Sequence, residues 1–176
     1  MNSALVLLTA LATTSITGCA AAATTTVDGK ICSADSFAAP FAATDPCDGE
    51  AVVTAALAAV FDYRPGEQAD QRDAARTARP LLTPALAQQA ESSAQAWGPV
   101  TAAQWQRWRA DHTPVHTSVT VSRDDHPPDT VTAFARVAVV EIEAPDTTPI
   151  TFPVYATLSR TAPTTGWFLS GLRVQA

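Results

Sequence analysis

Histidines near carboxylates are the side chains of this sequence that could bind a metal ion. The chain has 3 histidines, and two of them, His112 and His116, are four residues apart. That spacing places two ligands on one face of a helix, but Pro114 lies between them and a strand is predicted to begin there. Residues 124–126, Asp-Asp-His, lie in a proline-bounded turn that we expect to be solvated. We therefore expect no metal site.

Proton transfer is the second chemistry to consider. Its candidates are Asp111 and His112 at a helix-to-strand junction, His116 on the following strand, and Arg136 or Glu141 on the next strand. A catalytic base needs a buried pocket and a shifted pKa. His116 alternates with serine and threonine, which places it on the polar face of its strand. The prediction is that the chain is not an enzyme, with a His/Asp enzyme as an alternative.

Cofactor binding is disfavoured by the motifs of the sequence, and nucleic-acid binding is disfavoured by its charge. The 7 glycines form no phosphate-binding spacing, and neither Gly-x-Ser-x-Gly nor His-Glu-x-x-His occurs, so we expect no cofactor. The formal charge is −6, the pI is about 4.8, and Lys30 is the only lysine. An acidic chain without a basic run is a poor candidate for binding nucleic acid.

The 3 cysteines lie in the first third of the chain, at Cys19, Cys32 and Cys47. A thiol can accept a lipid, form a disulfide or bind zinc, and no spacing among these three fits zinc. An apolar stretch at residues 4–12 precedes them. It has the length of a signal peptide and is shorter than the roughly 18 to 20 residues of a membrane-spanning helix.

Residues 16–19, Ile-Thr-Gly-Cys, resemble the lipobox of bacterial lipoproteins, in which the cysteine is acylated and becomes the new N-terminus. The resemblance implies a signal peptide at 1–18, a lipid on Cys19, and attachment to the extracytoplasmic face of the cell membrane. Residues 1–3 carry no Lys or Arg, which departs from the usual basic start of a signal peptide. The Ala/Thr-rich segment 20–26 suits a flexible tether.

The other two cysteines are predicted to form a disulfide. If Cys19 carries the lipid, Cys32 and Cys47 remain as one pair in an oxidising compartment. The segment between them shows no periodicity, so we expect a loop, and closing it contributes on the order of 3 kcal/mol. Two independent buried thiols are the alternative. Residues 19–47 are thus predicted to be a lipidated tether and disulfide loop, and 48–176 the folded domain.

Helical periodicity dominates the first half of that domain. Apolar residues at i, i+4, i+7 and i+8 predict a helix at 50–62, and a more polar one follows at 69–78. Thr83 and the proline after it predict the start of a helix that runs to residue 96. Thr101 and Gln104 match a capping box that opens a fourth, short helix.

From residue 115 the period changes to alternation, which predicts strands at 115–122, 130–143, 150–160 and 167–174. Their short connections predict an antiparallel meander. Pro153 lacks a donor, which favours an edge, a strand start or a bulge. Helices followed by an antiparallel sheet predict an α+β fold with the helices on one face.

Tryptophans could line a ligand pocket between the helices and the sheet. Trp105, Trp108 and Trp167 are the candidate lining residues, with Trp97 nearby in sequence. The interpretation that we favour is that they fill this space, because alanine-rich helices leave volume that large side chains must occupy.

Arginines form the basic clusters of the sequence. They could contact anionic lipid headgroups, but we favour solvated helix faces because they are dispersed over two helices. These residues are Arg72, Arg76, Arg79, Arg107 and Arg109.

The order of elements and the placement of aromatic residues resemble the nuclear transport factor 2-like (cystatin-like cone) superfamily. The residues that carry the resemblance are 61–63, 81–84, 105–108 and 166–172, within 48–176. It implies three to four helices packed on a curved four-stranded antiparallel sheet. The details are most similar to actinobacterial exported proteins associated with mammalian-cell-entry transport or conjugative type IV secretion.

This resemblance implies a non-catalytic accessory or scaffold protein of a cell-envelope transport or conjugation assembly. Its expected partners are the membrane, through the lipid on Cys19, and other proteins of the assembly. An exposed sheet face or edge is the expected protein-binding surface. The alternative is a carrier of a small apolar ligand in the cone-shaped pocket.

Overall fold

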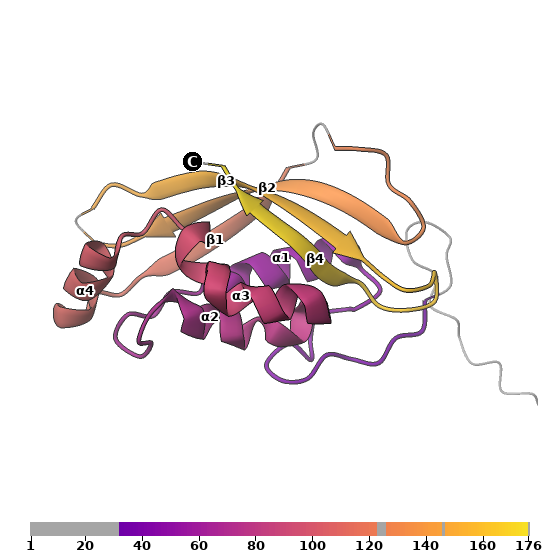
Figure 1. Ribbon diagram of the computed structural model, residues 1–176, viewed down its shortest axis with the longest axis horizontal. Coiled ribbons are helices and arrows are strands. Elements are labelled where there is room, and N and C mark those ends of the chain that lie inside the picture. Colours follow the sequence, from indigo (N-terminus) through magenta and orange to yellow (C-terminus); the bar gives the residue numbers. More distant parts are fainter. Residues whose placement is uncertain (1–31, 123–125, 146, 176) are drawn as a thin grey trace, which may run out of the picture.

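The computed structural model of the protein describes residues 32–122, 126–145 and 147–175. Within these residues, helices come first and strands follow, as predicted (Figure 1). The helical elements are α1 (Gly49–Val60), α2 (Gln71–Thr77), the 3-10 helix η1 (Arg79–Leu81), α3 (Pro84–Trp97) and α4 (Ala102–Ala110).

Each α-helix begins at a side chain that caps its free backbone N–H groups. The Asp48 carboxylate accepts hydrogen bonds from Glu50 and Ala51 at the start of α1, and Asp70 does the same for α2. The predicted caps Thr83 and Thr101 are confirmed for α3 and α4. The sequence prediction missed only η1, in which the chain makes one further turn between α2 and α3.

The strands form one antiparallel sheet in the order β1-β2-β3-β4, which confirms the meander. Pro153 lies inside β3, opposite Val139, and its carbonyl accepts from the N–H of Gln175 just beyond β4. In a β-strand the N and O atoms of one residue point to the same side. The Pro153 nitrogen therefore faces the end of the β3–β4 ladder, where its missing N–H costs little pairing. The strands are β1 (His116–Val121), β2 (Ala133–Glu143), β3 (Ile150–Ser159) and β4 (Phe168–Val174).

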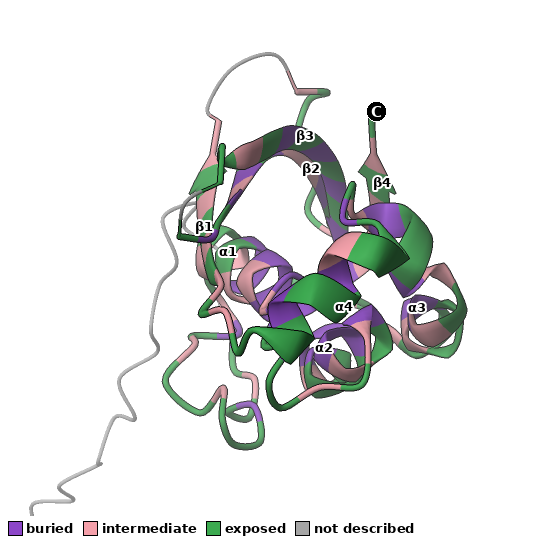
Figure 2. Ribbon diagram, turned by 90° about the vertical axis from the view of Figure 1, so that its left-hand side faces the viewer, coloured by how far each residue is buried: buried purple, intermediate pink, exposed green. Residues whose placement is uncertain are grey.

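The helices cover one face of the sheet, as predicted, and the sheet arches over them (Figure 2). In β3 the buried residues Phe152, Val154, Ala156 and Leu158 alternate with exposed ones. We call the covered face the inner face and the other the outer face. Helix α1 contacts β1, β3 and β4 from below, while α3 contacts α2 and β4. Glycine is required at position 49, at the start of α1, because the Phe134 ring occupies the space that a Cβ atom would need.

The predicted disulfide between Cys32 and Cys47 is confirmed, with an S–S distance of 2.00 Å. The segment that it closes contains turns and neither helix nor strand. Two backbone hydrogen bonds attach this segment to the β3–β4 connection, from Ser33 N–H to the Thr164 carbonyl and from Trp167 N–H to the Pro46 carbonyl. The disulfide therefore holds residues 32–48 against the end of the sheet at which β4 begins.

Candidate interaction surface

The candidate proton-transfer residues do not come together in the structure. Asp111, His112 and His116 are exposed, and His112 has a positive φ of 51° in the turn after α4. Glu141 lies on the outer face of β2, where it alternates with buried Val140 and Ile142. Arg136 shares the inner face with Phe134, because the two are two residues apart on the same strand.

Arg136 is held by contacts that anchor β2 to the start of α1. Its guanidinium donates to both carboxylate oxygens of Asp129 at 2.8 Å and lies 3.6 Å from Glu50. It also stacks over the Phe134 ring at 4.6 Å. The hydrogen bonds with Asp129 raise the pKa of Arg136 further above its usual value. The observed role of this arginine is therefore to join elements of the fold.

The predicted turn around residues 124–126 is only partly described, since Asp124 and Asp125 lie outside the described residues. The Nδ1 atom of His126 lies 3.5 Å from an oxygen of Asp129 and 2.9 Å from the Pro127 carbonyl oxygen. Across the part of the chain that is described, no group of three or more His, Cys, Asp or Glu residues is placed to hold a metal ion.

All four tryptophans are buried. Two of them lie on α4 and another lies directly before β4, and these two elements are at opposite ends of the molecule (Figure 1). On α4, Trp105 packs edge-on against Tyr63 at 5.4 Å and its indole N–H donates to the Ala69 carbonyl at 3.0 Å. At the start of β4, Trp167 packs edge-on against Phe134 at 4.8 Å and under the guanidinium of Arg160. Burial also raises the pKa of the Tyr63 hydroxyl. Trp105 and Trp167 thus fill different parts of the hydrophobic core.

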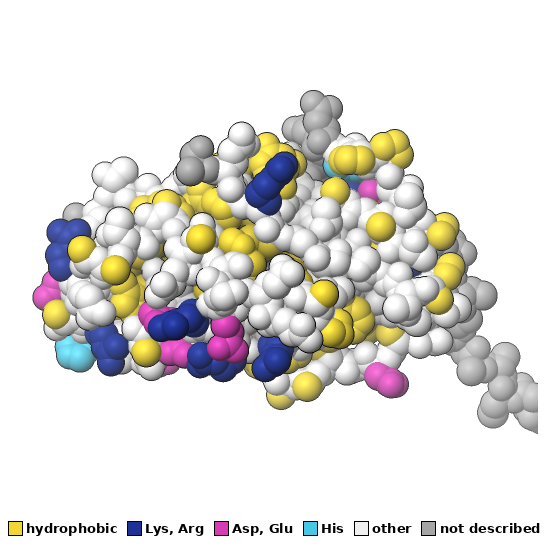
Figure 3. Space-filling view, viewed as in Figure 1, with side chains coloured by type: hydrophobic (Ala, Val, Ile, Leu, Met, Phe, Trp, Pro, Cys, Tyr) yellow, Lys and Arg dark blue, Asp and Glu magenta, His cyan; other side chains and the backbone are white. Residues whose placement is uncertain are grey.

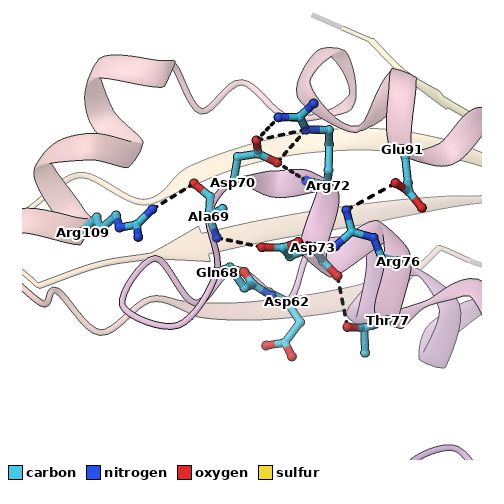
Figure 4. Close-up of polar contacts among 10 residues, drawn as sticks. All are labelled: Asp62, Gln68, Ala69, Asp70, Arg72, Asp73, Arg76, Thr77, Glu91 and Arg109. Carbon is cyan, nitrogen blue, oxygen red and sulfur yellow. Dashed lines mark hydrogen bonds and ion pairs between the residues drawn. The ribbon is translucent and has the colours of Figure 1, made fainter.

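Charged side chains on the helical side of the molecule are largely paired (Figures 3 and 4). Arg72 binds Asp70, and Arg76 binds both Asp73 and Glu91. The Arg72 guanidinium lowers the pKa of Asp70, and a hydrogen bond from the Ala69 backbone lowers that of Asp73. The predicted arginine clusters thus include residues that neutralise neighbouring carboxylates. Arg109 donates to the Ala69 carbonyl, and Arg79 and Arg107 are exposed.

The outer face near β1 differs, because its ionisable groups have no charged partner among the described residues. Glu141, Glu143 and His116 form no ion pair or side-chain hydrogen bond there. His116 lies directly opposite Glu143 in the β1–β2 register, and Glu141, two residues before Glu143, lies opposite Ser118. Among the described strands, an arginine does lie on the outer face, but it is Arg173 on β4. It stacks on Tyr155 at 5.3 Å.

A shallow, open pocket lies at the same end of β1, with a volume of about 610 Å³. Its size falls within the range of ligand pockets, roughly 300 to 1,000 Å³. None of the predicted tryptophans lines it, and sequence reasoning did not identify it. Its walls are mostly aliphatic, with His116 and Glu143 as the ionisable residues. The lining residues are Pro114, Val115, His116, Glu143, Ala144, Pro145 and Pro149.

The free edge of β1 can be assigned from the register. The N–H of Ser122 donates to the Val137 carbonyl at 2.7 Å, directly after the β1–β2 ladder. Because pairing alternates in an antiparallel ladder, His116, Ser118 and Thr120 also direct their backbone groups to β2. Thr117, Val119 and Val121 must then direct theirs away from the sheet. No hydrogen bond joins these outward groups to a described residue outside the ladder.

The opposite edge, at β4, is partly covered by another segment. Leu82 forms a parallel bridge with Leu169, and the N–H of Thr83 donates to the Leu169 carbonyl at 2.8 Å. A bulge between Thr157 and Leu158 further interrupts the regular ladder on this side. Among the described residues, the β4 edge of the sheet is therefore partly covered, whereas the β1 edge is not.

Cys19 and the predicted signal peptide lie outside the described residues. Among the residues described, no helix is both long enough and apolar enough to cross a bilayer. No protein-family model, curated protein or solved structure matches the chain. Fold and disulfide together define an α+β protein with four helices packed against an open four-stranded antiparallel sheet.

Proposed function

We propose that this protein is a lipid-anchored accessory or scaffold protein on the extracytoplasmic face of the cell membrane. Its folded part binds other proteins of an envelope transport or conjugation assembly and carries out no reaction of its own. The finer classification proposed is a nuclear transport factor 2-like domain. The observation that carries the proposal is the uncovered β1 edge, beside an outer face with unpaired charges.

The tether fits this arrangement because it joins the body at the end where the disulfide lies. The thirteen positions from Cys19 to Cys32 span at most about 45 Å. A lipid on Cys19 would keep the domain within that distance of the membrane surface. The pocket and the first residues of β1 lie at the other end of the β1–β2 ladder, where a neighbouring protein can reach them.

A non-catalytic role is supported by the placement of the ionisable groups. His116 and Glu141 lie on the outer face, whereas Arg136 lies on the inner face in contact with Asp129. General acid–base catalysis needs such groups within reach of one substrate in a pocket that excludes water. The arrangement fits binding better than proton transfer.

Membrane attachment is tested by comparing the native chain with Cys19→Ala. We expect the native chain to incorporate a radiolabelled fatty acid and to sediment with membranes, and the variant to do neither. Cys32→Ala is the matched control, since it removes a different thiol and should leave labelling intact. Equal membrane association of Cys19→Ala without labelling would contradict the anchor.

Partner binding is tested by placing a photoreactive amino acid at Thr120 on β1 or at Gln88 on α3. Both positions are exposed. We expect irradiation of intact cells to cross-link an envelope protein through position 120 and not through position 88. Cross-links of equal yield at both positions, or at neither, would argue against β1 as the binding surface.

A further inference from the structure

We propose that β1 receives an extended segment of the partner protein as an additional, antiparallel strand, and that this segment carries Lys or Arg near its C-terminal end. The inference rests on the proposed function, since it states how the partner would be recognised. Strand addition uses backbone hydrogen bonds for affinity and alternate side chains for specificity. The observations that support it concern the backbone, the flanking side chains and the charges at one end of β1.

The backbone of β1 offers a regular template. Thr117, Val119 and Val121 each present an outward N–H and C=O, so three residues can pair with an added strand. The register of β1 with β2 continues without a bulge from His116 to Val121. Exposed edges are commonly protected by proline, lysine or a bulge, and β1 has none of these.

The side chains that flank this edge define an alternating partner. Val119 and Val121 are half-buried on the inner face, so an added strand would cover them with apolar residues. Thr117 on the same face donates its hydroxyl to the Phe61 carbonyl at 2.6 Å, which fixes β1 to the end of α1. Ser118 and Thr120 are exposed on the outer face and favour polar partner residues.

Charge and shape at the start of β1 define which end of an antiparallel segment would be cationic. An antiparallel strand would end beside His116, near the unpaired carboxylate of Glu143 and the pocket. Proline walls are rigid, so a side chain entering the pocket would require little reordering. The carboxylates of Glu141 and Glu143, in a chain of net charge −6, favour a cationic side chain at that end.

The direct test is amide hydrogen exchange of the purified full chain with a synthetic peptide. The probe is a peptide of about ten residues that alternates valine and threonine and ends in two lysines. We expect it to slow exchange at Thr117, Val119 and Val121 by about tenfold or more. Unchanged exchange at these amides, or protection at Leu172 and Val174 on β4 instead, would overturn the proposal.

Three matched peptides separate strand addition and charge recognition from other binding. N-methylation of the alternate residues that face β1 should abolish the protection, whereas N-methylation of the remaining residues should leave it intact. A peptide ending in two glutamates should bind about fivefold or more weakly. Equal effects of the two methylation patterns, or equal affinity of the lysine and glutamate peptides, would contradict the proposed recognition.

Variants of the protein test the contribution of charge to peptide binding. The dependence of protection on protein concentration tests which molecule occupies the edge. Glu143→Gln should weaken the lysine peptide about threefold, and Glu67→Gln on the helical side should leave its affinity unchanged. Protection of the β1 amides that rises with protein concentration without peptide would identify a second copy of this chain as the occupant and overturn the proposal. These experiments need no membrane, so their failure is distinguishable from failure of the Cys19 anchor.

Discussion

β1 and β4 are the two edge strands of one sheet, and they differ in what lies beside them (Figure 2). The segment at Leu82 and Thr83 bonds to Leu169 on β4, next to α3. Beside β1 the outward groups of Thr117, Val119 and Val121 have no such segment among the described residues. Among the described residues, the core is therefore complete without a segment that covers the edge of β1. The proposed partner strand would therefore require no described part of the molecule to unfold.

Charge follows the same division. On the helical side, Asp70, Asp73 and Glu91 are bound by arginines. Near β1, no arginine among the described residues binds Glu141 or Glu143. A carboxylate that already binds an arginine gains little from a second cation, whereas an unpaired carboxylate can bind a cation of a partner. The paired carboxylates thus lie on the helical side, and the unpaired ones lie near β1, where the proposed partner segment would bind.

The largest expected effect comes from the covered edge. Leu169→Ala removes a fully buried side chain beside Leu82 and should lower the free energy of unfolding by about 2 to 5 kcal/mol. Val119→Ala on β1, where the side chain is half-buried, should cost about 1 kcal/mol. Urea denaturation measures both values. Equal losses would contradict the difference between the edges.

Proline substitutions test the direction of the backbone groups on β1. Thr120→Pro removes an N–H that faces β2 and should cost about 1 to 3 kcal/mol, because the Val139 carbonyl loses its partner. Val119→Pro removes an outward N–H, and its cost should be roughly 1 kcal/mol, mainly from lost apolar area. The same urea measurements apply. A larger loss for Val119→Pro would reverse the assigned directions.

Removing the disulfide tests the end of the sheet at which β4 begins. The double variant Cys32→Ser, Cys47→Ser opens the loop between positions 32 and 47 and should lose about 3 kcal/mol of stability. Amide exchange should accelerate first at Ser33 and Trp167, which join the loop to the β3–β4 connection. Faster exchange spread evenly over β1 and β4 would show that the disulfide does not act locally.

Acid titration should give the smallest effect, and it reports on the paired charges. Because Asp70 and Asp73 have lowered pKa values in the folded state, their contribution is present above the unfolded value of about 3.9 and is lost as the pH falls through the folded values. Asp70→Asn should make unfolding less sensitive to pH in that window. The change should shrink in high salt, because the pair is near the surface. An unchanged pH profile of stability would contradict the pairing.

Local sequence signals predicted much of the fold because their causes are local. Thr83 and Thr101 cap helices through bonds three residues away, and strict alternation marks β3. The covered edge could not be predicted, since it depends on Leu82 meeting Leu169 across most of the domain. The inner face of β2 was ambiguous as well. Valines occur on both faces, so Arg136 and Glu141 could not be assigned to opposite sides from the pattern alone.

Amide hydrogen exchange along β1 in the free protein reports directly on whether the edge of this strand is uncovered. We expect alternation, with rapid exchange at Thr117, Val119 and Val121 and exchange slower by about a hundredfold or more at Ser118 and Thr120. Uniform protection of all these amides would contradict it, because the edge of β1 would then already be covered.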